Sequence, residues 1–332
     1  MPLVPPSTSV RELDDDSIAL LLEAYAEQIK AVHPNLLCGA PFGALCVALY
    51  GPGRCGPGDA DADRRIWKHF IVGYADVPLP APYTTWRGMF ESSCVTERDV
   101  YGRTMLVWAS QFGHAALVRS LLARGADVNE VTDIGWTALL LASRRGHIDV
   151  VEALLPAVAV DTPGMHGNTA LMEASKKGHL AVVELLLAAG AVVGVRNVAN
   201  DTALMFASEQ GHADVARRLL AAGADVNARD SLNRTALMFA TYGTRVEVVQ
   251  VLVAAGADVN AANANGFTPL MNASGDGNVA MVEALLAAGA DVNALDDDDV
   301  EVASTALGWA RTFNRGDRAG VVRVLLAAGA TE

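Results

Sequence analysis

The stretch at residues 219–227, Leu-Leu-Ala-Ala-Gly-Ala-Asp-Val-Asn, occurs a second time, unchanged, at residues 285–293. The chain also carries seven threonines at intervals of 33, 32, 33, 33, 33 and 37 residues, each followed two residues later by leucine and five residues later by alanine. These threonines are Thr104, Thr137, Thr169, Thr202, Thr235, Thr268 and Thr305. Self-similarity at this period predicts a solenoid in which one small unit is repeated along the chain.

One unit can be interpreted directly as a pair of helices. Thr202 has an N-cap side chain, so a first helix is expected from Ala203 onward. Gly211 permits a tight turn with positive φ, and a second helix is expected from Asp214. Gly223 then occupies the place of a C-cap glycine. A single pair of this kind cannot bury its apolar face, whereas stacked neighbours can, so the fold class expected is all-α.

The pattern resembles the ankyrin repeat over residues 99–332, which implies seven repeats. The family's Thr-Pro-Leu-His becomes Thr-Ala-Leu-Met in several units, so apolar packing is expected where that histidine usually bonds. Its place is taken by Val107, Leu140, Met172, Met205, Met238, Met271 and Gly308. Histidines of a second kind recur in Gly-His pairs and are therefore interpreted as structural, each bonding across its own turn. They are His114, His147, His179 and His212.

Three units depart from the pattern. The second lacks a C-cap glycine and carries Pro156, which predicts an early end to its second helix. The fifth shifts its turn to Gly243-Thr244-Arg245. The seventh has extra residues before it, around 296–299, and between its helices, near 314–320. Because solenoid stability is roughly a sum over units and interfaces, this last unit is expected to open first.

The first 98 residues form a separate region, predicted as a flexible tail at 1–12 and a helical domain at 13–98. Residues 13–18 resemble the opening of an F-box, and residues 66–70 and 85–90 resemble the tail that follows one. The resemblance implies docking on a Skp-type adaptor and a cullin. The docking residues would be Leu13, Ile18, Leu21 and Leu22. The alternative is a helical cap that covers the first repeat without any link to ubiquitin.

Composition and motifs exclude several classes of function. The chain has 25 basic and 38 acidic residues, and neither half has a basic excess, so nucleic-acid binding is not expected. The first residues lack the layout of a signal peptide, and the longest uncharged stretch is broken by Gly and Pro, which favours a cytoplasmic or nuclear location without membrane contact. No Cys-x-x-Cys pair, phosphate loop or nucleophile elbow is present, so no metal, cofactor or enzyme activity is predicted.

What remains is a binding surface. The family resemblance places exposed variable positions just before each threonine and seven and eight residues after it, on the concave face. The partner-binding residues predicted there are Tyr101, Arg103, Phe112, Trp136, Arg144, Arg145, Lys176, Lys177, Arg234, Tyr242 and Phe267. The early part of this set is basic and aromatic within an acidic protein, which predicts a protein target with an acidic segment. Trp136 is expected to be an exposed anchor, beside four cations that no core residue satisfies. The alternative is that some of these side chains are only solvated, and that Arg144 and Arg145 pair with Asp133 or Glu173.

The function expected is that of a protein–protein adaptor. In the favoured version the repeats hold a target and residues 13–90 recruit a cullin-type ubiquitin ligase. F-box and ankyrin segments are also combined in large DNA viruses, so the resemblance extends to a host-directed adaptor. The alternative is a plain ankyrin scaffold whose N-terminal domain only caps the array.

Overall fold

The computed structural model describes residues 103–296, 305–313 and 316–331. The predicted tail, the F-box-like domain with Leu13, Ile18, Leu21 and Leu22, and also Tyr101, lie outside these residues. The described residues fall into two compact units, which divide between Ala138 and Leu139.

Helices and turns account for the described chain, with no β-strand among the described residues. The unit up to Ala138 contains α5 (Met105–Phe112) and α6 (Ala115–Ala123), and α7 (Ala138–Arg145) begins at its boundary. The unit from Leu139 continues with α8 (Ile148–Leu154), α9 (Ala170–Lys177), α10 (Leu180–Ala188), α11 (Ala203–Gln210), α12 (Ala213–Ala221), α13 (Ala236–Tyr242), α14 (Val246–Ala254), α15 (Pro269–Gly275), α16 (Val279–Ala287), α17 (Ala306–Thr312) and α18 (Arg318–Ala327). Short 3₁₀ turns, η3 (Leu155–Ala157) and η4 (Met165–Gly167), precede α9. No described helix has both the length and the apolar character needed to cross a bilayer.

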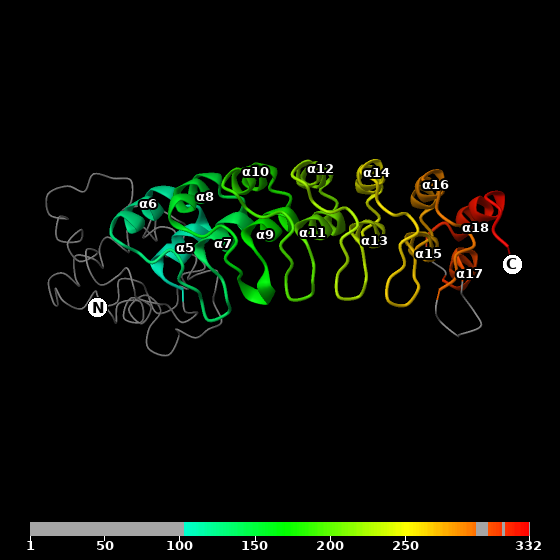
Figure 1. Cartoon of the computed structure of the whole chain (residues 1–332), viewed down its shortest axis with the longest axis horizontal. Helices are drawn as coiled ribbons and strands as arrows, with labels where there is room; N and C mark the ends of the chain where they lie inside the picture. The colour runs from blue at the N-terminus through cyan, green and yellow to red at the C-terminus, as the bar shows by residue number, and fades with distance from the viewer. Residues whose placement is uncertain (1–102, 297–304, 314–315, 332) are drawn as a thin grey trace, which may run out of the picture. The chain divides into compact units, whose positions relative to one another are not determined.

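The unit from Leu139 has two layers of helices. Inner helices α9, α11, α13 and α15 form one row and outer helices α10, α12, α14 and α16 form the other, as Figure 1 shows, with the connecting turns extending from the inner row. Leucines and valines of both helices fill the space between the layers; Leu204, Val215 and Leu219 are fully buried examples. Alanines such as Ala207 let neighbouring inner helices approach closely.

Threonine side chains cap α9, α11 and α15, as the sequence predicted, whereas Thr235 precedes α13 without a side-chain cap hydrogen bond. The side chain of Thr202 accepts from the backbone N of Met205 at 3.4 Å. The sulfur of Met205 in turn accepts from the backbone N of Thr202 at 3.4 Å. The same reciprocal pair forms between Thr169 and Met172 and between Thr268 and Met271. Methionine at the family's histidine position therefore completes a capping box, a role beyond the apolar packing expected from sequence.

The Gly-His pairs connect consecutive repeats. The Nε2 atom of His179 lies 3.1 Å from the carbonyl oxygen of Arg144, so the ring bonds to the preceding repeat and not across its own turn. The same ring covers Gly146, and the ring of His212 covers Gly178. Both glycines have positive φ, 76° and 74°. The structural role expected for these histidines is confirmed for His179, and the expected bond across its own turn is wrong.

Two of the irregular units behave as their sequences indicate. Helix α8 ends at Leu154 and passes into the 3₁₀ turn that contains Pro156, two residues shorter than α10 or α12. In the fifth unit Gly243 has a right-handed conformation, and Thr244 takes the positive φ of 55° that a glycine holds in its neighbours. The register shift at this turn therefore places a β-branched residue where glycine is preferred.

Candidate protein-binding face

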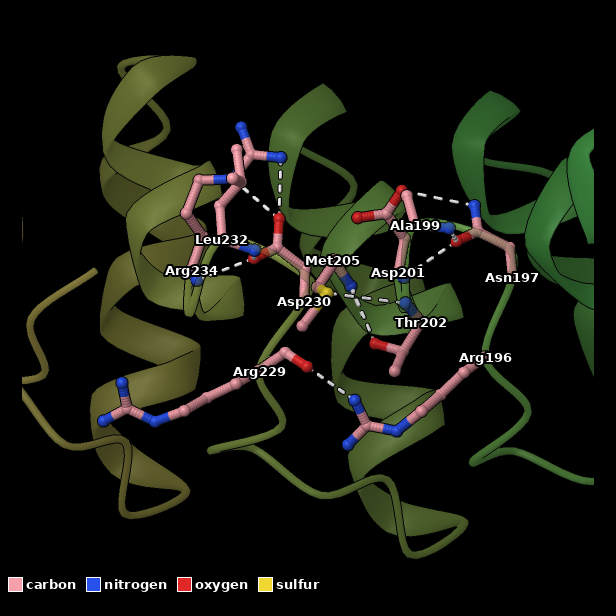
Figure 2. Close-up of polar contacts among 10 residues, drawn as sticks. All are labelled: Arg196, Asn197, Ala199, Asp201, Thr202, Met205, Arg229, Asp230, Leu232 and Arg234. Carbon is pink, nitrogen blue, oxygen red and sulfur yellow. Dashed lines mark hydrogen bonds and ion pairs between the residues drawn. The ribbon is translucent and has the colours of Figure 1, made fainter. Parts of the chain in front are cut away.

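The turns that precede the inner helices are built around one polar side chain five residues before the threonine. Asp230 is buried, and its carboxylate accepts from the backbone N of Leu232 at 2.9 Å and of Arg234 at 2.7 Å. Asn197 accepts in the same way from Ala199 and Asp201, at 2.9 and 2.8 Å (Figure 2). Asn263 repeats the arrangement with the backbone N atoms of residues 265 and 267. These side-chain bonds fix the direction of the residue just before each threonine.

Backbone hydrogen bonds tie each turn to the next. The backbone N of Val198 donates to the oxygen of His166 at 3.0 Å, and that of Ser231 donates to Ala199 at 2.9 Å. Two arginines add to this ladder, because Arg196 donates to the oxygen of Arg229 at 2.5 Å and Arg229 donates to that of Ala262 at 2.8 Å. The side chains of Arg196 and Arg229 extend in the same direction in Figure 2. The turns thus form a connected support rather than independent loops.

The inner face is the surface formed by three kinds of residue in the unit from Leu139. A finger residue is the residue directly before the recurring threonine of its repeat. A middle residue lies four positions after that threonine, and the two end residues lie seven and eight positions after it. The finger residues are Asn168, Asp201, Arg234 and Phe267. The middle residues are Glu173, Phe206, Phe239 and Asn272. The end residues are Arg144, Arg145, Lys176, Lys177, Glu209, Gln210, Tyr242 and Gly243.

A middle residue contacts its own finger residue. Asn168 donates from Nδ2 to Glu173 Oε1 at 2.9 Å, and the Arg234 guanidinium lies 4.5 Å from the centre of the Phe239 ring. Arg234 also forms a 2.6 Å ion pair with buried Asp230. The geometry over Phe239 is that of a cation–π contact, so Arg234 is held by both partners.

A middle residue also receives an end residue from the preceding repeat. Arg144 Nη1 lies 3.6 Å from Glu173 Oε2, and Lys176 Nζ lies 5.0 Å from the centre of the Phe206 ring. Glu173, although charged, is buried in this contact. Apart from Glu173, which the sequence offered as a partner of Arg144 and Arg145, the middle residues were missed. Their recurrence at one position of the 33-residue period was the signal that could have found them.

Several predicted binding residues are less available than expected. Trp136, treated with the unit up to Ala138, is half-buried, and its backbone N donates to Thr132 Oγ1 at 3.0 Å. Phe112 packs on Trp108 with ring centres 4.4 Å apart, and Arg103 reaches Gln111 at 3.4 Å. The expectation of a fully exposed tryptophan anchor is therefore wrong, because part of the Trp136 residue is buried.

In the unit from Leu139, Phe267 packs edge-on against Trp309 of the next repeat, with ring centres 4.4 Å apart. The favoured expectation that no core residue satisfies the four cations is wrong for Arg144, and the alternative pairing of Arg144 with Glu173 is confirmed. Arg145 and Lys177 are exposed, and Lys176 is half-buried. None of these three forms an ion pair within the described residues. Tyr242 remains 42% exposed, beside the Phe239 ring.

The positions of the four cations can also be explained by helix stability. The last turns of α7 and α9 contain these four cations, Arg144, Arg145, Lys176 and Lys177. Positive charge at the C-terminus of a helix interacts favourably with the helix dipole. Helices α11, α13 and α15 form in the same layer without a basic residue in that turn. The helix dipole therefore does not require these charges.

Burial shifts the ionisation of three groups on or beside this face. It raises the pKa of the Tyr242 hydroxyl, which stays neutral and able to donate a hydrogen bond. It lowers the pKa of His179, with the hydrogen bond to Arg144 acting in the opposite direction. Because the folded state binds this proton less tightly than the unfolded chain, stability from His179 is present above pH 6.5 and is lost as the pH falls through the lowered pKa.

Asp201 is expected to be a site where one substitution stabilises the fold. Desolvation by burial raises its pKa above 3.8, and its Oδ1 has no hydrogen-bond partner among the described residues. The charged form is therefore penalised, and stability is lost as the pH rises through the raised pKa. Asp201→Asn should increase the free energy of unfolding at pH 7 by about 0.5 kcal/mol, because the half-exposed site is partly screened by solvent.

Urea unfolding of both proteins at pH 7 and at pH 3 measures this prediction. The gain should disappear at the lower pH, where the aspartate is protonated. Asn168, the finger residue of the preceding repeat, shows that an amide fits this position, since its Oδ1 accepts from Asn197 Nδ2 at 2.9 Å. If Asp201→Asn raised the free energy of unfolding equally at both pH values, the burial of the Asp201 charge would not be the cause of the gain.

The fold is that of a helical repeat solenoid. Its helix pairs are stacked, its turns are joined by hydrogen bonds, and side chains of successive repeats line one face. Models of ankyrin repeats match residues 106–197, 160–230 and 190–263, and a further ankyrin-repeat model matches residues 252–303. Together these matches extend over more than half of the chain. The chain belongs to the ankyrin-repeat family, whose members characteristically bind other proteins rather than catalyse reactions.

Similarity to one solved structure and to one curated protein agrees with this assignment. The crystal structure of the human ASB11 ankyrin repeat domain superposes with a TM-score of 0.61 at 27% sequence identity, covering 69% of this chain and 100% of that one. Glycerophosphocholine phosphodiesterase GDE1 of Candida albicans is 37% identical over 70 residues. That match covers 20% of this chain and 6% of the curated relative, so the chain matches a small fraction of its length.

Proposed function

We propose that this chain is a protein-binding adaptor whose inner face holds an acidic segment of its target. The observation that carries the proposal is the cluster formed by Arg145, Lys176 and Lys177. These three cations occupy adjacent repeats and have no carboxylate partner within the described residues, in a chain of net charge −13. Such a cluster steers and orients an anionic partner, and the rest of the acidic surface repels the same partner elsewhere.

The adaptor role extends to ligase recruitment through residues 13–90. Its support is the resemblance of that segment to an F-box, which implies a Skp-type adaptor and a cullin as further partners. Under this proposal the chain selects substrates for a cullin-type ubiquitin ligase in the cytoplasm or nucleus, and the target is a host protein if the chain is viral. If residues 13–90 only cap the repeats, the chain is a plain scaffold that binds its target through the same inner face, without any link to ubiquitin.

Affinity capture of the full chain from a eukaryotic cell extract tests both parts. Wild-type protein should retain a target and a cullin component. Leu21→Ala combined with Leu22→Ala should lose the cullin component and keep the target. Recovery of a target without any cullin component by the wild-type protein would contradict ligase recruitment and leave the scaffold function.

Glu173 is expected to compete with the partner for Arg144. Its carboxylate is an internal anion 3.6 Å from the guanidinium, so Glu173→Gln should remove a competitor of the external carboxylate. The affinity for a glutamate-rich peptide should rise about threefold, the scale of one partly exposed ion pair. Titration calorimetry measures the change, with Glu184→Gln on the exposed side of α10 as a control that removes the same charge. A rise of the same size in both variants would assign the effect to net charge alone.

A further inference from the structure

The end residues of the inner face change in chemistry from one repeat to the next. The end residues are cationic on α7 and α9, acidic and amide on α11, and aromatic on α13. Glu209 is half-buried and accepts from Gln210 at 3.2 Å. A partner carboxylate that is attracted by Lys176 and Lys177 is therefore repelled one repeat further along, so the acidic contact is confined to the first part of the face.

The aromatic part of the face lies beyond Glu209. Tyr242 is exposed, and its ring meets that of Phe239 edge-on with ring centres 6.4 Å apart, while the Arg234 guanidinium lies over the Phe239 ring. The charge of Arg234 is compensated by Asp230, so the Tyr242 and Phe239 rings form an aromatic surface beside a paired cation. Such a surface favours an aromatic or large aliphatic side chain of the partner, with a separate hydrogen-bonding group of the partner near the Tyr242 hydroxyl.

The two parts are separated by two steps of the inner-helix row, from α9 through α11 to α13. Packed helices stand about 8–10 Å apart, so the separation is about 16–20 Å. An extended chain covers about 3.5 Å per residue, and about five or six residues are needed to span it.

We propose that the partner binds along the inner face as an extended segment with two elements, an acidic run at α7 and α9 and an aromatic or large aliphatic residue about five or six positions away at Tyr242. This inference rests on the proposed function, because it specifies the partner of the same face. Glu209 fixes the register by excluding carboxylates from α11. The spacing between the two elements, and not their presence alone, selects the partner.

Synthetic peptides test the spacing. Each carries a run of three glutamates and one tryptophan, joined by Gly-Ser linkers of about two, about five or about nine residues. The peptide with the intermediate linker should bind the full chain about tenfold more tightly than the other two, because only that length lets both elements engage at once. Fluorescence anisotropy with labelled peptides measures the three affinities.

Three variants separate the steps of the proposal. Tyr242→Ala should equalise the three peptides at the weaker affinity, and Lys176→Glu with Lys177→Glu should weaken all of them. Glu209→Lys should move the optimum to the shortest linker, since it carries the cations one helix nearer to Tyr242. Glu283→Lys, an exposed change of the same charge on outer helix α16, should leave the optimum unchanged. Thermal unfolding confirms that each variant is folded.

The outcomes distinguish this inference from the proposed function. Equal binding of the three peptides by the wild-type chain, with loss of binding in the double lysine variant, would overturn the spacing and leave the acidic site standing. An optimum that Glu209→Lys does not move would overturn the role of Glu209. Binding that is the same in wild type and in the double lysine variant would contradict the acidic site itself.

Discussion

Gly178→Ala is expected to lower the free energy of unfolding by about 2–4 kcal/mol. Gly178 ends α9 with a φ of 74°, so a side chain there incurs the cost of a left-handed conformation. A Cβ atom at this position would also meet the ring of His212 from the next repeat, at its Nδ1 and Cε1 atoms. The ring can move only by giving up its packing against the helix end, so overpacking adds to the conformational cost.

Gly190 supplies a matched control within the same repeat. It has a φ of 90°, but a Cβ atom there would meet no atom within 4 Å. Gly190→Ala should therefore cost about 1 kcal/mol, the conformational part alone. Urea unfolding of both variants measures the difference, and a double-mutant cycle of Gly178→Ala with His212→Ala isolates the contact. Equal costs at the two glycines, or a cycle without coupling, would show that the histidine ring does not constrain Gly178.

Lys176→Glu combined with Lys177→Glu is expected to weaken binding of an acidic partner by about 10- to 100-fold. Both residues lie at the end of α9 without an ion-pair partner among the described residues, so the reversal replaces two attractions by two repulsions. The loss should appear mainly in the association rate and should shrink as salt is added, because exposed charges are screened.

The control is Arg318→Glu with Arg323→Glu on outer helix α18, which changes net charge equally on exposed residues away from the inner face. Surface plasmon resonance with a glutamate-rich peptide, at low and at physiological salt, provides the rates. If the control variant loses as much affinity as the lysine variant, the interaction depends on the net charge of the chain and not on the inner face.

The repeat and its helix boundaries could be predicted from sequence because they depend on local chemistry. Thr202 begins α11 and Gly211 ends it, as expected, since capping and positive φ concern residues that are close along the chain. Pro156 shortened the outer helix of its repeat for the same reason. The period of 33 residues also indicated which positions line up from repeat to repeat, because equivalent residues of stacked units align, and the family resemblance assigned those positions to the concave face.

The availability of each face residue was decided only by the tertiary structure. Arg144 and Arg145 are neighbours of the same type, yet one faces buried Glu173, 29 residues away, and the other is exposed. Phe267 meets Trp309 across 42 residues of sequence, and an insertion separates the two repeats. The sequence by itself determined the unit, its caps and the face on which a side chain lies. Which side chains remain available on that face depends on the residue that the adjacent repeat places opposite each one, a contact between positions distant in the chain that only packing brings together.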